Sequence, residues 1–296
     1  MNPHSHSSHS HHLHPGGVDV NCGQSPPYYT KYVCDAVKSG AINTTDVDRA
    51  ARRYWRTMMR LGMFDPMDTQ PFVTDLGVKD VDTQENRALA QRAAAESFVL
   101  LKNDNGFLPL DGREGRLDIN KAKIALIGPL FNATQDLLSA PQYHGQNILV
   151  NSHSPLLVAQ RRGLDIGSRV AKGVNICDWV PPGYPNQPCS RGPNGKDPHP
   201  LPPPDISGIP AAVTAAKSAD IAIIFLGSDQ TTEAENFDRR TLGLVGAQED
   251  LLEAVSAVQS NVVVVLVHGG PIAVESAEAD PSVRAIVAAF QPGESY

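Results

Sequence analysis

The sequence has 296 residues, of which 41% are hydrophobic, and a formal net charge of −7. This length suggests about two domains, and the hydrophobic content is sufficient for packed cores. The acidic balance argues against a nucleic-acid-binding protein, which usually presents a basic face. The longest apolar run, residues 262–267, is far shorter than the roughly 20 residues that a membrane span needs, so we expect neither nucleic acid nor membrane as a partner.

The amino-terminal residues 1–16 hold six of the ten histidines among serine and proline. This composition cannot bury a core and predicts a disordered His-rich tail. Metal binding is an alternative interpretation, and an unstructured leader is favoured over it. No apolar signal-peptide core is visible in these residues.

A small helical region is predicted over residues 17–64. A strand and turn over 17–23 precede a helix over 29–39, and a second helix begins after a cap at Thr44 or Thr45. Four arginines project mostly off the apolar face of this second helix: Arg52, Arg53, Arg56 and Arg60. They suggest either an anion site or, more simply, a solvated or interdomain face.

Residues 65–120 are predicted to form a linker. Residues 65–82 are punctuated by proline and expected to be extended, residues 83–97 are rich in alanine and predicted helical, and residues 98–102 read as a strand.

Residues 121–296 alternate between buried strands and amphipathic helices, with loops over 129–160 and 179–209. Such alternation is typical of an α/β domain with a doubly wound, mainly parallel sheet sandwiched by helices. The last residues directly follow a strand, so we expect a carboxyl-terminally truncated domain. The predicted strands cover 124–128, 171–178, 221–226, 262–267 and 285–290, and the predicted helices cover 211–218 and 247–259.

A polar loop follows the wholly apolar strand 221–226. The carboxyl edge of a parallel sheet is where ligands and chemistry collect, so this loop is the candidate site. It carries four carboxylates and two guanidinium groups: Asp229, Glu233, Glu235, Asp238, Arg239 and Arg240.

The four cysteines form two local pairs, Cys22 with Cys34 and Cys177 with Cys189. Local pairs in loops suit the disulfides of an exported protein, and four unpaired thiols are an equally open alternative. Sequons at Asn43 and Asn132 lean towards a secreted glycoprotein. A zinc site is disfavoured because the cysteine spacing is too wide.

Five segments in order resemble glycoside hydrolase family 3, in its β-xylosidase/α-arabinofuranosidase branch. GVDVNCG (17–23) is similar to the end of that family's (β/α) barrel. DVDRAARRYWRTMMRLGMFDP (46–66) and ESFVLLKNDNGFLPL (96–110) resemble the following helix and the linker strand. IALIGPLFNATQDLL (124–138) looks like the start of the sandwich domain, and GSDQTTEAENFDR (227–239) like its acid/base loop.

The resemblance implies a fragment of an exo-acting retaining β-glycosidase. Residues 17–64 would be a barrel remnant and residues 121–296 the α/β sandwich domain, with terminal sugars of plant-wall oligosaccharides or aryl glycosides as substrates. Glu233 would be the acid/base and Glu235 the runner-up, while the glutamate that is not the acid/base would bind sugar or pair with Arg239. Asp238 and Arg239 are expected to form a structural pair. No metal or cofactor is implied. The nucleophile, an aspartate of the missing barrel domain, has no counterpart here, so the chain alone should be inactive.

Two departures from the family pattern and two other functions remain in view. The segments 140–145 and 244–248 differ mildly from what is common in the family. A non-catalytic carbohydrate-binding or interaction fragment is the alternative function. A Rossmann-type nucleotide site is disfavoured, because residues 127–130 lack the required glycines. His144 and His153 carry no predicted role, and His268 is predicted to be a hydrogen-bonded turn residue.

Overall fold

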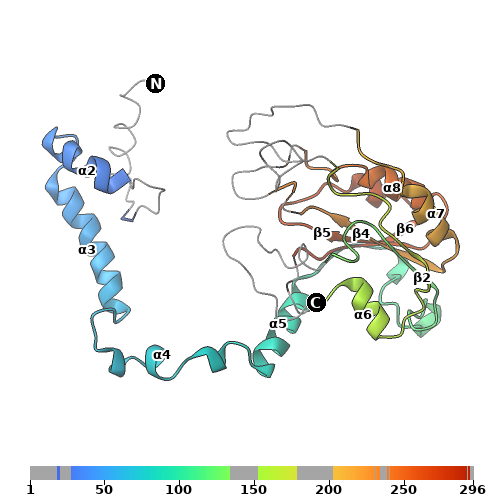
Figure 1. Cartoon of the computed structure of the whole chain (residues 1–296), viewed down its shortest axis with the longest axis horizontal. Coiled ribbons are helices and arrows are strands. Elements are labelled where there is room, and N and C mark those ends of the chain that lie inside the picture. The colour runs from blue at the N-terminus through green and yellow to red at the C-terminus, as the bar shows by residue number, and fades with distance from the viewer. Residues whose placement is uncertain are drawn as a thin grey trace. The chain divides into compact units, whose positions relative to one another are not determined.

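The chain divides into two compact units, residues 1–83 and 84–296, and each is described by itself (Figure 1). The structure is a computed structural model. It describes residues 19–20, 28–133, 153–178, 203–229, 231–233, 239, 241–291 and 293. The predicted tail 1–16 and most of the predicted strand 17–23 lie outside the described residues.

The first unit contains helices α2 (Tyr28–Lys38) and α3 (Thr44–Arg60), both as predicted to within a residue or so. The cap of α3 differs from the prediction. It is Asn43, whose side chain accepts a hydrogen bond from the Asp46 backbone N–H, while Asp46 accepts one in return from the Asn43 backbone. An asparagine at this position satisfies an orphan donor better than threonine does, which explains the shift.

Residues 65–82 are not extended throughout, contrary to the prediction. They fold into three short helical turns: η1 (Met67–Thr69), α4 (Pro71–Thr74) and η2 (Val78–Asp80). Pro71 occupies the first turn of α4, where its missing N–H costs nothing. The Gln70 amide also donates to the carbonyls of Gly62 and Asp65, at 2.6 and 3.0 Å, and ties the segment to the end of α3.

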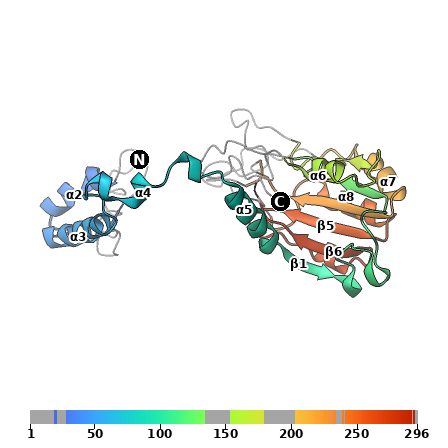
Figure 2. The same ribbon diagram turned by 90° about the horizontal axis from the view of Figure 1, so that it is seen from below.

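The second unit is built on a six-stranded sheet with the order β1-β6-β5-β4-β2-β3 (Figure 2). All neighbouring strands are parallel except β1, which runs antiparallel to β6. The mainly parallel α/β fold predicted from the sequence is therefore confirmed. The strands are β1 (Val99–Asn103), β2 (Ile124–Ile127), β3 (Val170–Ala171), β4 (Ile221–Gly227), β5 (Val262–Val267) and β6 (Val283–Ala288).

Helices cover both faces of the sheet, because the central strands are apolar on both sides. In β4 the alternate residues Ala222, Ile224 and Leu226 belong to one core cluster, and the intervening residues pack against the other. Helices α7 (Ile209–Lys217), α8 (Gln248–Ser256) and α9 (Glu275–Ala279) contribute to the first cluster. Helix α6 (Pro155–Arg161) contributes to the second. Helix α5 (Gln84–Ser97) leads into β1.

Several boundaries depart from the sequence prediction. The short strand expected within 171–178 is the two-residue β3, which begins one residue earlier, at Val170, and β6 begins two residues earlier than expected. Helix α6 lies within the predicted loop 129–160, where Ser154 caps it by accepting from the Leu157 N–H. Short helix α9 was also not predicted. Most of the predicted loop 179–209 lies outside the described residues. Among those that are described, no helix has the length and apolarity to cross a membrane.

Candidate active site

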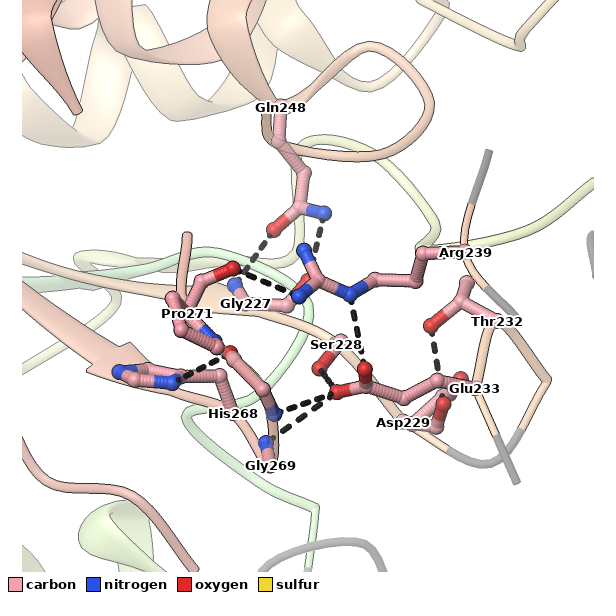
Figure 3. A network of polar contacts seen from close by, with 11 residues as sticks. Gly227, Ser228, Asp229, Thr232, Glu233, Arg239, Gln248, His268, Gly269 and Pro271 are labelled. Atoms are coloured by element: carbon pink, nitrogen blue, oxygen red, sulfur yellow. Dashed lines mark hydrogen bonds and ion pairs between the residues drawn. The ribbon is translucent and has the colours of Figure 1, made fainter. Parts of the chain in front are cut away.

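The carboxyl ends of β4 and β5 place two loops side by side. The two strands are parallel and in register up to Gly227 and Val267, so the residues that follow them meet at one edge of the sheet. Ser228 to Glu233 follow β4, and His268 to Pro271 follow β5 (Figure 3).

Gly227 allows the ends of β4 and β5 to lie close together where the two loops begin. Its φ is +147°, and a Cβ there would lie 1.7 Å from the carbonyl oxygen of Val267, so no other residue fits. Its backbone N–H and C=O both bond to the side chain of Gln248, at 2.8 and 2.9 Å. The Gln248 amide also donates to the Val245 carbonyl at 2.8 Å and is fully buried. It joins the start of α8 to the end of β4, a role that the sequence analysis missed.

Asp229 shapes the turn that begins the acidic loop. Its side chain accepts hydrogen bonds from the N–H and the hydroxyl of Thr231. Its carbonyl accepts from the backbone N–H groups of Thr232 and Glu233, both at 3.1 Å, and from the Thr232 hydroxyl at 2.9 Å. The first carboxylate of the loop is therefore a turn residue of the kind that aspartate favours.

Glu233 is held by four donors from its own domain. One carboxylate oxygen accepts from the Ser228 hydroxyl at 2.7 Å and from the N–H groups of Gly269 and Gly270, each at 3.2 Å. The other oxygen accepts from Arg239 Nε at 2.8 Å. Figure 3 shows the carboxylate between the two loops. Both of its oxygens are thus occupied by protein groups.

The balance of these contacts keeps Glu233 ionised. Burial raises the pKa of the Glu233 carboxyl, but hydrogen bonds from Ser228, Arg239 and Gly270 and the charge of Arg239 together bring it below its ordinary value. A general acid must carry its proton when substrate arrives, so this environment favours a carboxylate over an acid at this position.

Arg239 crosses from the acidic loop to the loop after β5. Its Nη2 donates to the Pro271 carbonyl at 2.6 Å, and only 8% of its side chain is exposed. Its Nη1 is buried and finds no hydrogen-bond partner among the described residues. The predicted pairing of Arg239 with a glutamate of the loop is made by Glu233. Its predicted partner Asp238 lies outside the described residues, as do Glu235 and Arg240.

His268 is a hydrogen-bonded turn residue, as predicted. Its Nδ1 lies 2.9 Å from the Gly270 carbonyl oxygen, and a carbonyl only accepts, so Nδ1 carries the proton. Its ring packs against Phe290, with centroids 4.9 Å apart. Burial lowers the pKa of His268, as does nearby Arg239, against the opposing hydrogen bond to Gly270 and the charge of Glu233.

Three other predicted features concern other segments of the chain. The arginine-rich face of α3 lines a hollow of about 490 Å³, in which Arg49 pairs with Asp46 and Arg53 with Asp19. Cys34 has a free thiol, so for the pair of Cys22 and Cys34 it is the alternative of unpaired thiols that the structure supports. Cys177 is disulfide-bonded, and its predicted partner Cys189 lies outside the described residues.

Ser228 and the paired glycines 269 and 270 were likewise not predicted as parts of the site. The signal for the glycines was present, since Gly-Gly-Pro directly follows a buried strand, but their partner in the other loop depends on the tertiary fold. In the described part of the chain no group of three or more His, Cys, Asp or Glu side chains is placed to hold a metal ion.

The sequence has recognisable relatives. Residues 98–296 match the family described as the glycosyl hydrolase family 3 C-terminal domain. The chain is 32% identical over 278 residues to a probable exo-1,4-β-xylosidase of Aspergillus fumigatus, and 34% identical over 280 residues to β-D-xylosidase 1 of Arabidopsis thaliana. These alignments cover 94% of the chain but only 30% and 31% of those relatives, so the chain spans about a third of their length.

Solved structures agree with these relatives. The fold matches a family 3 exo-β-xylosidase, XlnD, in complex with a xylobiose aziridine activity-based probe, with a TM-score of 0.72 and 29% identity over 99% of this chain and 33% of that one. It also matches a family 3 β-glucosidase of Bifidobacterium adolescentis, with a TM-score of 0.58 and 28% identity over 91% of this chain and 33% of that one. The resemblance found in the sequence is thereby confirmed.

Proposed function

This chain belongs to glycoside hydrolase family 3, and we propose that it is the acid/base-bearing part of an exo-acting retaining β-glycosidase of the β-xylosidase type. Its substrates would be terminal sugars of plant-wall oligosaccharides. The proposal is supported by xylosidase relatives that align with 94% of the chain. The single observation that carries it is the acidic loop after β4, anchored at the carboxyl edge of the sheet by Glu233.

Retaining hydrolysis needs two carboxyl groups about 5 Å apart, one as nucleophile and one as acid/base. We propose that the nucleophile belongs to a barrel domain that these 296 residues do not include. This assignment is supported by the chain's spanning only 30% of the Aspergillus relative. The acidic loop would complete the site by supplying the proton for the leaving oxygen.

Between the two candidates for the acid/base we propose Glu235, because the contacts of Glu233 argue against a proton donor at that position. Glu233 is ion-paired to Arg239 and has a lowered pKa, whereas the acid must be held protonated until the glycosidic oxygen accepts its proton. Glu235 follows two positions later in the same loop. The proposed role of Glu233 is therefore to anchor the loop rather than to transfer a proton.

The activity is tested in two preparations. The 296-residue chain alone should release no aryl leaving group from an aryl β-xyloside above the buffer rate, because one carboxyl group cannot perform a double displacement. A fusion in which residues 17–296 replace the matching third of the Aspergillus relative should restore hydrolysis. Turnover by the chain alone, or an inactive but folded fusion, would contradict the proposal. The inactive fusion would favour a non-catalytic carbohydrate-binding role.

The role of Glu235 is tested in the same fusion. Glu235→Ala should slow substrates with poor leaving groups most, because those need protonation, and azide should restore turnover of substrates with good leaving groups. Glu233→Ala should show no azide rescue. If Glu233→Ala is rescued by azide and Glu235→Ala is not, the two roles are exchanged.

We further propose that the chain belongs to an exported protein. The disulfide at Cys177 suits an oxidising compartment, and the sequons at Asn43 and Asn132 would be glycosylated there. Mass spectrometry of the protein from its natural source, before and after enzymatic removal of N-glycans, tests this. A mass that deglycosylation leaves unchanged, together with a Cys177 thiol that is free before any reductant is added, would contradict it.

A further inference from the structure

The acidic loop begins and ends on two side chains that bind each other. Glu233 and Arg239 are six positions apart, and their ion pair is 2.8 Å long. Residues 234–238, which include Glu235, lie between them in the sequence. We propose that this pair is a clamp: it fastens both ends of the loop to Gly269–Pro271, so that Glu233 and Arg239 are positioning residues for the proton donor. The inference rests on the proposed function in assigning that donor as Glu235.

The clamp is anchored outside the loop as well as within it. Each end makes its own contact with the residues after β5: Glu233 accepts from the N–H groups of Gly269 and Gly270, and Arg239 donates to the Pro271 carbonyl. Figure 3 shows the guanidinium and the carboxylate meeting beside this segment. Because β5 is a central strand of the sheet, the clamp ties the loop to the middle of the sheet.

The segment after β5 leaves little room for a side chain at Gly269 and Gly270. A Cβ on Gly269 would lie 3.3 Å from a carboxylate oxygen of Glu233. A Cβ on Gly270 would lie 2.9 Å from Arg239 Nη2 and 3.2 Å from the other Glu233 oxygen. Neither glycine has a φ between +20° and +160°, so backbone conformation does not explain them. The close approach of the Glu233 and Arg239 side chains explains the two glycines.

Stability alone does not account for this arrangement. Arg239 is 8% exposed and leaves Nη1 without a partner among the described residues, and burying an incompletely satisfied ion pair is often no better than burying apolar side chains. What the pair supplies is a fixed geometry. A misplacement of about 1 Å at a reacting group can reduce the rate about 100-fold.

Two variants separate positioning from other roles. Arg239→Ala removes the clamp. Gly270→Ala keeps every polar group but pushes a methyl group against both partners, so it provides a second route if Arg239→Ala fails to fold. Arg161→Ala is the matched control, because Arg161 is an exposed arginine in the last turn of α6, away from the loop.

The first readout is hydrogen exchange in the full 296-residue chain, which needs no activity. In both variants the amides of Gly269 and Gly270 and those of residues 231–233 should exchange on the order of tenfold faster or more, with the rest of the sheet unchanged. The control should match the original chain. Unchanged exchange in folded Arg239→Ala and Gly270→Ala would overturn the clamp, whatever the fate of the proposed function.

The second readout is kinetics in the fusion. Both variants should lower kcat about 10- to 100-fold with a smaller change in KM, the loss should grow with poorer leaving groups, and azide should not restore it. Arg239→Lys should recover part of the rate. Faster exchange with unchanged kcat would overturn the positioning role. Inactivity of the unsubstituted fusion would count against the proposed function instead, and the exchange result would then decide the clamp alone.

Discussion

Two carboxylate–guanidinium pairs in this chain have similar lengths and opposite surroundings. Arg239 and Glu233 meet at 2.8 Å with 8% and 21% of their side chains exposed, whereas Arg53 and Asp19 meet at 2.6 Å with 40% and 27% exposed. The first pair joins two loops at the edge of a sheet, and the second joins α3 to the residues before α2. Distance alone therefore says little about what an ion pair does. Burial and the neighbouring donors decide it.

The largest effect is expected from Arg239→Ala. It leaves the largely buried Glu233 carboxylate without its charged partner. Because Glu233 is partly exposed, the loss of unfolding free energy should be about 2–3 kcal/mol, at or below the low end of values for buried pairs. Urea unfolding of the 296-residue chain measures it. The double variant Glu233→Gln/Arg239→Met should lose less than the single one, and an additive result would show that the two side chains are not coupled.

A somewhat smaller loss is expected from Gln248→Leu, which removes the side chain that bonds to the backbone N–H and C=O of Gly227. The Gly227 N–H and C=O would lose their buried partners, at a cost of about 2 kcal/mol. Gln248→Glu would bury a carboxylate against the carbonyl oxygens of Gly227 and Val245, which costs more than losing the hydrogen bonds, so at pH 8 its unfolding midpoint should lie below that of Gln248→Leu. Equal midpoints for the two variants would contradict the bonding described for Gly227.

The stability of the chain should also depend on pH through two groups in the loops after β4 and β5, His268 and Glu233. Because the pKa of His268 is lowered on folding from its ordinary 6.5, the unfolded chain binds more protons just below pH 6.5, and stability should fall as the pH drops through this range. A further loss should follow below about 4.5, where protonation of Glu233 is favoured by unfolding. Urea midpoints from pH 8 to 4 measure both.

The control for this pH series is a histidine variant. His268→Gln should remove the slope just below pH 6.5 and leave the lower one. A His268→Gln chain with the original slope would show that another group causes it.

The smallest effect is expected from Arg53→Ala. The Asp19–Arg53 pair is exposed enough for water and salt to screen it, so its removal should shift the urea midpoint less than any change above. Repeating the measurement at about 1 M salt, where the screening length is about 3 Å, should make the shift disappear. A shift as large as that of Arg239→Ala would erase the contrast between the two pairs.

The sequence allowed the central strands and the location of the site to be predicted, because both depend on local pattern. The apolar runs 221–226 and 262–267 are long and uninterrupted, and the polar loop follows the first of them directly. The strands found there, Ile221–Gly227 and Val262–Val267, match closely. Helix α6 was missed although Ser154 and Pro155 form a recognisable helix start, since a seven-residue helix gives little periodicity.

The role of Glu233 could not be predicted, because its partners are distant in sequence. Gly269 and Gly270 lie 36 and 37 positions later, and they reach the carboxylate only because β4 and β5 are neighbours in the sheet. The sequence analysis ranked Glu233 above Glu235 as proton donor from the family resemblance alone. That ranking stays a prediction, and the hydrogen bonds around Glu233 are the reason for proposing the reverse.

The position of β1 has a consequence for how this domain is made. Among the described residues β1 is the first strand, yet it pairs antiparallel with β6, the last one described, with Val99 opposite Ala288. During synthesis on the ribosome, β1 therefore emerges long before its neighbour exists. The pairing of β1 must wait for β6, and such a long-range contact predicts slow folding. Until then an apolar strand is without its pairing partner, so the nascent domain should depend on chaperones to escape aggregation.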